Sequence, residues 1–257
     1  MKIATWNVNS LAVRLPQVLD WLALHQPDAL CLQETKLTDD KFPHAELAAA
    51  GYVSEWFGQR TYNGVALLTR APVIDVVKNF PGFDDPQARV IAATVAGVRL
   101  INVYIPNGQS VDSDKFVYKL GWLDALHAWV AQQLAQYTRL VLVGDYNIAP
   151  EDRDVHDPVA WAGQVLCTPQ ERGHFQGLLG LGLHDAFRLF EQAPKSWSWW
   201  DYRMLAFRKN QGLRIDHILV SDAVKASVVA CVIDKLPRKN ERPSDHAPVL
   251  VELAPSC

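Results

Sequence analysis

The chain has 257 residues, a formal net charge of −3, 49% hydrophobic residues and 21% charged residues. These values are ordinary for a globular protein and exclude a disordered, collagen-like or coiled-coil chain. No apolar run approaches the roughly 20 residues that a membrane helix needs, and the polar residues that soon follow Met1 do not resemble a secretory signal peptide. We therefore expect a cytoplasmic protein that has no membrane partner.

Charge and cysteine usage narrow the class further. The slight acidity argues against a protein that coats nucleic acid without specificity, although one basic face can still bind DNA locally. Cys31, Cys167, Cys231 and Cys257 are scattered and form no C-x-x-C pair. This pattern favours neither a zinc site nor a disulfide scaffold, and it is typical of a reducing cytoplasm.

Strand-like runs recur along the whole chain. They are short and rich in Val, Ile, Leu, Thr and aromatic residues, and they lie at residues 2–8, 29–33, 65–69, 89–95, 99–105, 140–143, 215–221, 227–233 and 248–253. The runs 29–33 and 140–143 are almost entirely apolar, as expected of strands that are covered on both faces.

Helical periodicity separates some of these runs. Residues 15–22 carry leucine and valine at helical spacing, with Pro16 tolerated in a first turn. Residues 116–134 form a longer apolar stripe, preceded by Ser113 as a candidate N-cap, and residues 170–181 form a weaker third stripe. The alternation of strands and helices predicts a layered α/β or α+β domain.

No linker or low-complexity tract divides the chain, so we expect a single domain over residues 1–257. Two long polar connections stand out, at residues 150–169 and 201–214. Loops of more than about 12–15 residues inside a compact domain usually have a function.

Polar side chains follow or open several predicted strands. They are Asn7, Glu34, Tyr104, Asp145, Asn147, Asp216, Asp245 and His246. Binding sites in layered α/β proteins collect at strand ends. Oxygen ligands without thiolates suit a hard cation such as Mg²⁺, and an Asp–His unit suits proton transfer or charge stabilisation at a phosphate. Taken singly, each residue is also explained as a turn, cap or packing residue.

A second unusual segment combines aromatic and basic residues. Three tryptophans fall within residues 197–200, and Arg203, Arg208, Lys209 and Arg214 follow. Aromatic side chains can form a wall for a sugar or base, and the basic side chains suit DNA phosphates. The alternative is a tryptophan-rich core strand, and the pattern alone does not decide between the two.

Read together, these segments resemble the exonuclease III family of DNA-repair nucleases, within the endonuclease/exonuclease/phosphatase superfamily. The matching segments run in the family's order and are TWNVNSL (5–11), LQETK (32–36), YNGVALLTR (62–70), NVYIPNG (102–108), GDYNIAP (144–150), SWWDYR (198–203), GLRIDHILVS (212–221) and SDHAPV (244–249). Any one short match is weak, whereas the ordered set is highly specific.

The resemblance implies a four-layer α-β-β-α sandwich of two packed mixed β-sheets. It implies hydrolysis of DNA phosphodiesters in base excision repair with Mg²⁺, or Mn²⁺, as cofactor. The implied activities are cleavage 5′ of abasic sites, 3′-to-5′ exonuclease action and removal of 3′ blocking groups. The expected partner is double-stranded DNA with abasic sites or with blocked or recessed 3′ ends. The expected state is a monomer in the cytoplasm, associated with the nucleoid.

The resemblance also implies roles for the polar residues. Glu34 matches the main metal-binding glutamate, and Asn7 and Asp245 match residues that line the metal site. The full set expected around the metal is Asn7, Glu34, Asp145, Asn147, Asp245 and His246.

The remaining roles concern the reacting phosphate. Asp145 matches the aspartate that activates the attacking water, and Asn147 matches the amide beside the transition state. Tyr104 matches a catalytic tyrosine. Asp216 and His246 match the pair in which the carboxylate orients the imidazole at the scissile phosphate.

A sugar pocket is implied as well. Trp199, Trp200 and Leu213 match the apolar pocket that accepts a base-free deoxyribose turned out of the duplex. Residues 151–172 follow the family only in PEDRDVHDP, which leaves open the balance between abasic-site cleavage and 3′-end trimming.

Two other functions compete with a DNA-repair nuclease. A superfamily relative that hydrolyses a different ester, such as an inositol phosphate or a phospholipid, shares the Asn, Glu, Asp-x-Asn and Ser-Asp-His elements. A catalytically inactive binding protein is expected to lack one of Glu34, Asp145, Asn147 or His246, and all four are present.

Overall fold

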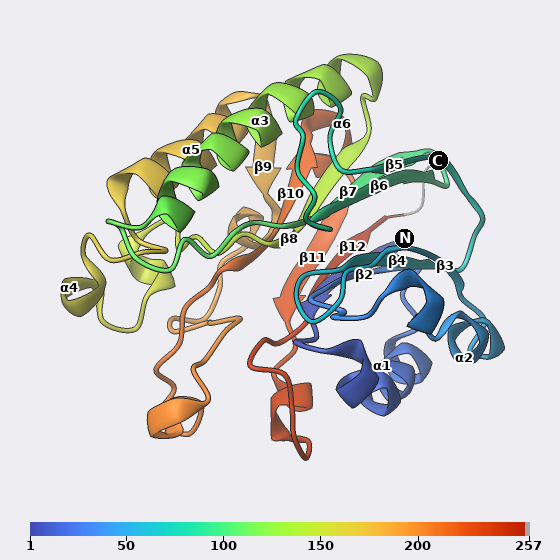
Figure 1. The fold of residues 1–257 in the computed structure, drawn as a ribbon, viewed down its shortest axis with the longest axis horizontal. Coiled ribbons are helices and arrows are strands. Elements are labelled where there is room, and N and C mark those ends of the chain that lie inside the picture. Colours follow the sequence, from blue (N-terminus) through green and yellow to red (C-terminus); the bar gives the residue numbers. More distant parts are fainter. Residues whose placement is uncertain (255–257) are drawn as a thin grey trace.

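The computed structural model describes residues 1–254, so Cys257 and the last residues of the expected domain lie outside the described part. Two six-stranded mixed sheets pack face to face, and helices cover both outer faces (Figure 1). The predicted four-layer α-β-β-α sandwich is confirmed. Within residues 1–254, no helix combines the length and the apolar character that crossing a membrane requires.

The first sheet has a parallel pair of strands at its centre. Its order is β11 (Val228–Ile233), β12 (Val249–Leu253), β1 (Lys2–Asn7), β2 (Ala29–Gln33), β4 (Val65–Thr69) and β3 (Val53–Phe57). Strands β1 and β2 are parallel and are connected by helix α1 (Leu11–His25), and every other pairing is antiparallel. Helices α1 and α2 (His44–Ala49) lie on the outer face of this sheet (Figure 1).

The second sheet repeats this plan. Its order is β5 (Val73–Lys78), β6 (Val90–Val95), β7 (Val98–Tyr104), β8 (Leu140–Asp145), β10 (Asp216–Ser221) and β9 (Leu183–Asp185). Strands β7 and β8 are parallel and are joined by α3 (Asp114–Gln136). Helices α3 and α5 (Pro169–Gly180) cover its outer face, and two short helices complete the set, α4 (Pro158–Trp161) and α6 (Asp222–Lys225) (Figure 1).

Sequence patterns missed three strands, β3, β5 and β9, all at sheet edges. Strand β5 is mostly exposed and its pairing with β6 is irregular, and β9 has three residues, so none shows a clear apolar alternation. The predicted cap of α3 is confirmed, since the Ser113 hydroxyl accepts a hydrogen bond from the Phe116 amide. Helix α1 begins at Leu11, so Pro16 lies one turn further inside than expected.

The core between the sheets is apolar except near one end. Strand side chains such as Ile3, Cys31 and Val141 fill it and are fully buried. Gln33 of β2 and Asn102 of β7 are also fully buried, and the Gln33 amide donates to the Asn102 side chain at 2.7 Å. This hydrogen bond crosses from one sheet to the other and fixes how their strand ends face each other.

Candidate active site

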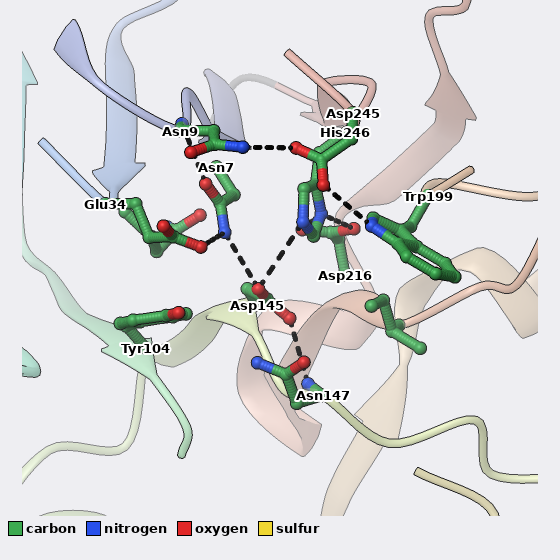
Figure 2. Close-up of polar contacts among 12 residues, drawn as sticks. Asn7, Asn9, Glu34, Tyr104, Asp145, Asn147, Trp199, Asp216, Asp245 and His246 are labelled. Atoms are coloured by element: carbon green, nitrogen blue, oxygen red, sulfur yellow. Dashed lines mark hydrogen bonds and ion pairs between the residues drawn. The ribbon is translucent and has the colours of Figure 1, made fainter. Parts of the chain in front are cut away.

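Strand register explains why distant segments meet at one end of the sandwich. In the second sheet, Tyr104 is paired with Asp145 across β7 and β8, and Asp145 is paired with Asp216 across β8 and β10. In the first sheet, Asn7 at the end of β1 is paired with Gln33, directly before Glu34. Figure 2 shows the resulting cluster, with Asp145 between the side chains from the two sheets.

Asn7 connects the two sheets at this end. Its side-chain amide donates to Glu34 Oε1 and to Asp145 Oδ2, both at 2.9 Å (Figure 2). The second oxygen of Glu34 lies 2.9 Å from the ammonium of Lys36. The two carboxylates are therefore held within one hydrogen-bonded group, although they come from different sheets.

Asp216 and His246 form an oriented pair on the other side of Asp145. His246 Nδ1 lies 2.9 Å from Asp216 Oδ2, and Ser198 donates to the same oxygen at 2.7 Å. The other ring nitrogen, Nε2, lies 3.7 Å from Asp145 Oδ2. Ligand atoms of Asp145, Asp216 and His246 all lie within 4.8 Å of one another. The carboxylate of Asp216 thus orients the imidazole toward Asp145.

Burial and neighbouring charge shift the pKa values of this group. Burial, with Asp216 nearby, raises the pKa of Asp145 to about 7. Burial disfavours the charged form of His246, but the carboxylates of Asp216 and Asp145 outweigh it and raise the pKa of His246 to about 10. Burial and the carboxylates of Glu34 and Asp145 raise the pKa of Tyr104 well above its usual value. His246 and Tyr104 are therefore hydrogen-bond donors near pH 7.

Several site residues have left-handed backbone conformations. Asn9, Glu34, Lys36 and Asn147 have φ angles between 45° and 55°. This region is unfavourable for residues with a side chain, and such residues concentrate at functional sites. The chain here turns sharply at the strand ends, which aims these side chains toward the cluster.

The donor set fits a divalent cation. Four carboxylates converge here, from Glu34, Asp145, Asp216 and Asp245, whereas Lys36 and His246 are the cationic groups that contact them. An excess of carboxylate oxygens without thiolates suits a hard cation such as Mg²⁺ or Mn²⁺. Glu34 and Asp145 bring carboxylate oxygens from the two sheets to the same Asn7 amide nitrogen, whereas Asn7 Oδ1 accepts from the Asn9 amide.

Asp245 lies at the edge of the cluster, next to the tryptophan segment. It accepts hydrogen bonds from Asn9 Nδ2 and from Trp199 Nε1, both at 3.0 Å (Figure 2). These donors and the charge of His246 outweigh burial and hold the pKa of Asp245 below its usual value. Asp245 therefore connects the cluster to Trp199.

The predicted sugar pocket is only partly accessible. Trp199 is partly exposed, but Trp200 is fully buried and Leu213 is 1% exposed. Leu213 is bridged to both Val155 and Trp199 and packs in an apolar cluster with Leu166. Trp200, predicted to line the sugar pocket, has no accessible surface, because it packs in a core cluster, edge-on against Phe207.

The predicted phosphate contacts divide in the same way. Arg203, Arg208 and Lys209 are exposed on the loop after the tryptophans. Arg214 is 1% exposed and forms ion pairs with Asp154 and Asp185, so its assignment as a DNA phosphate contact is wrong. Its partners are distant in the sequence, which no local pattern reveals.

Structure also adds contacts that the sequence patterns did not single out. Lys36, Asn9 and Ser198 contact the carboxylates, and Asn107 donates to Asn147 Oδ1 at 3.1 Å. Three of them lie inside recognised segments, LQETK, TWNVNSL and NVYIPNG, and Ser198 begins SWWDYR. The position of these residues inside the motifs is the sequence signal that could have identified them.

Comparison with known proteins agrees with this geometry. The endonuclease/exonuclease/phosphatase family matches residues 4–246. Exodeoxyribonuclease III of Haemophilus influenzae is 35% identical over 98% of this chain and 99% of its own length. A 3′ phosphatase from Neisseria, NExo, solved with a product DNA hairpin, has a TM-score of 0.97 and 51% identity over 98% of this chain and 99% of that chain.

An AP endonuclease from Archaeoglobus fulgidus has a TM-score of 0.95 and 36% identity, over 98% of this chain and 99% of that chain. These relatives confirm the prediction of an enzyme of the DNA-repair nuclease and phosphodiesterase type. Their names do not favour an inositol phosphate or phospholipid esterase. The chain belongs to the endonuclease/exonuclease/phosphatase family, in the branch that includes exodeoxyribonuclease III.

Proposed function

We propose that this chain is a Mg²⁺-dependent enzyme that processes 3′ ends of double-stranded DNA, with removal of a 3′-phosphate as its main reaction. The observation that carries this proposal is the burial of Leu213 and Trp200, two of the side chains matched to the sugar pocket. Leu213 is 1% exposed and Trp200 is fully buried, so neither offers an accessible wall to a sugar turned out of an internal abasic site. A 3′-terminal phosphate needs no such wall. The Neisseria relative at 51% identity, a 3′ phosphatase, supports the same choice.

The cation is assigned to the carboxylate oxygens of Glu34 and Asp145, on either side of Asn7. Bound there, a divalent cation would neutralise phosphate charge, stabilise the leaving oxygen and favour the ionised form of Asp145, whose pKa burial raises to about 7. The excess of carboxylates over cationic side chains supports this assignment.

Asp145 is assigned as the base. Its carboxylate takes the proton of the attacking water, whose oxygen forms the new bond to phosphorus while the bond to the sugar oxygen breaks. The imidazolium of His246, oriented by Asp216, donates to a non-bridging phosphate oxygen. The Asn147 amide and the Tyr104 hydroxyl are further donors as negative charge develops. The 3.7 Å spacing of His246 and Asp145 leaves both groups facing one small volume.

Exposed basic and polar groups on both sides of the cluster are assigned to the duplex. Arg203, Arg208 and Lys209 lie on the exposed loop near Trp199. On the other side, a cavity of about 590 Å³ beside Tyr104 is lined in part by Lys115. Binding through such groups explains how a chain with a net charge of −3 holds DNA. A monomer in the cytoplasm, near the nucleoid, is part of the same proposal.

A second candidate is cleavage at abasic sites. Trp199 is partly exposed beside Asp245, and the structural relative from Archaeoglobus fulgidus is an AP endonuclease. This function requires Leu213, which is 1% exposed in this structure, to become accessible to the sugar.

One assay panel separates the candidates. Duplexes with a 3′-phosphate, a recessed 3′ end or an internal abasic site, and a single strand, are compared at equal Mg²⁺ concentration. We expect the 3′-phosphate duplex to react fastest. Faster incision at the internal abasic site overturns the choice of main reaction, and hydrolysis of none of the DNA substrates overturns the DNA assignment.

A further inference from the structure

A buried lysine lies directly behind Asn147. Lys119 of α3 and Glu171 of α5 are both 0% exposed, and Lys119 Nζ lies 2.5 Å from Glu171 Oε1. Transferring two charges out of water is unfavourable, and their attraction often fails to compensate. Stability is therefore a weak explanation for this pair.

The ammonium has two further partners, both backbone carbonyls of the candidate site. Lys119 Nζ donates to Asn147 O at 2.7 Å and to Asn107 O at 3.2 Å. The side chains of the same two asparagines are hydrogen-bonded to each other at 3.1 Å. One ammonium thus holds together the loops that follow β7 and β8.

The backbone of Asn147 is held in a turn. Its φ angle is +49°, in the left-handed region, which asparagine adopts more readily than most residues with a side chain. Its amide donates to Asp145 Oδ1 at 2.9 Å and its carbonyl accepts from Lys119, so both sides of this residue's backbone are fixed. Rotation of this backbone would redirect the side-chain amide, which now points to Ile105 O at 3.0 Å.

Glu171 keeps the ammonium in place. Its Oε1 also accepts from the Leu166 amide at 2.9 Å, and its Oε2 accepts from the amide and hydroxyl of Thr168 at 3.0 and 2.7 Å. The carboxylate therefore cannot rotate freely, and the position of Lys119 Nζ follows from it. Packing is tight as well, since a side chain at Gly108 would approach Lys119 Cδ to 3.1 Å.

We propose that Lys119 is a positioning residue, whose ammonium, anchored by Glu171, sets the backbone turn that holds Asn147 beside Asp145. This inference rests on the proposed function, because it requires Asn147 to contribute to turnover.

A double-mutant cycle of Lys119→Met and Asn147→Ala tests it, with kcat, KM and melting temperature measured on a 3′-phosphate duplex with Mg²⁺. We expect Lys119→Met to lower kcat about 10-fold or more with KM changed less than about 2-fold, and to lower it less than about 2-fold further in the Asn147→Ala background. Lys225→Met, an exposed lysine in α6, is the matched control and should leave kcat unchanged.

An equal fold-loss in both backgrounds would mean that Lys119 supports the fold in general, and it overturns the inference alone. Full kcat in Lys119→Met does the same. If Asn147→Ala itself retains kcat, the proposed role of Asn147 fails and the inference fails with it.

Lys119→Met leaves Glu171 buried without its partner and is expected to melt at a lower temperature. The cycle is therefore repeated with Lys119→Met/Glu171→Gln, which buries no unpaired charge. A low kcat in this pair variant at a recovered melting temperature supports positioning. Recovery of kcat together with the melting temperature overturns it.

Discussion

Two clusters of buried charge lie near the ends of β8, β9 and β10. They differ in how far cationic side chains of the protein neutralise the buried carboxylates. In the first, Arg214 forms ion pairs with Asp154 at 2.6 Å and with Asp185 at 2.8 Å, and Arg188 also contacts Asp154. The guanidinium groups outweigh burial and hold the pKa of Asp154 below its usual value. This cluster contains its own cations.

The second cluster has more carboxylates than cations, because one imidazolium, that of His246, faces both of its buried aspartates. Asp145 and Asp216 both face His246, and burial raises the pKa of Asp145 to about 7. Two aspartates of one protein, both buried, are therefore shifted in opposite directions, and the neighbouring cations decide the sign. A buried carboxylate that the chain neutralises is structural, whereas one left with excess negative charge indicates a site for an external cation.

Removing divalent cations should have the largest effect on activity. The cluster of Asp145, Asp216 and His246 has excess negative charge, and we expect a bound cation to neutralise it. Activity on a 3′-phosphate duplex is expected to fall to background in EDTA and to return with added Mg²⁺. The melting temperature should rise on adding Mg²⁺, since a ligand that binds only the folded state stabilises it. Full activity in EDTA would contradict the metal-dependent assignment.

Asp145→Asn should lower kcat by about 10³-fold or more, equivalent to roughly 4 kcal/mol of barrier. The substitution removes the base and keeps the volume of the side chain. Because Asp145 is undercompensated in the metal-free protein, the melting temperature without metal should not fall. Single-turnover kinetics and thermal melts measure both. A loss of kcat below about 10-fold would show that Asp145 is not the base.

Arg214→Met removes the main cation of the first cluster, so that its carboxylates, like those around Asp145, carry excess negative charge. It leaves Asp154 and Asp185 buried without their main partner, so we expect a loss of about 3–5 kcal/mol in unfolding free energy. Urea unfolding measures this loss. The matched control is Arg203→Met, an exposed arginine whose removal should change the unfolding free energy by less than about 0.5 kcal/mol. Equal effects of the two variants would contradict the distinction.

A smaller effect should appear as acid sensitivity of the compensated cluster. Burial and Arg214 lower the pKa of His217 to about 4, and Arg214 Nη1 lies 3.1 Å from its Nδ1. A depressed histidine pKa gives stability that is present above the unfolded value of about 6.5 and is lost as the pH falls through it toward 4.

We therefore expect wild type to lose about 2 kcal/mol more unfolding free energy than His217→Gln between pH 7 and pH 5. Urea unfolding at the two pH values measures the difference. Parallel losses in the two proteins would show that His217 does not bind a proton on unfolding.

Local sequence patterns identified the polar residues of the site better than they identified the edge strands of the sheets. Apolar runs such as 29–33 and 140–143 identify buried strands. A carboxylate residue lies at the end of each strand, Glu34 after the first and Asp145 in the second. Glu34 and Asp145 were therefore identifiable as candidates, with the ordered motifs supplying their grouping. Edge strands such as β5 were not, because exposure removes the apolar alternation.

Only the tertiary structure decided which polar and aromatic residues face the solvent. Arg214 follows Arg208 and Lys209 closely in the sequence, yet it is buried while they are exposed, because its partners Asp154 and Asp185 come from distant segments. Hydrophobic periodicity reports which side chains share a face of one element, whereas burial of a charge depends on long-range ion pairs and hydrogen bonds. For the same reason, no local pattern shows that Trp200 is fully buried whereas Trp199 is partly exposed.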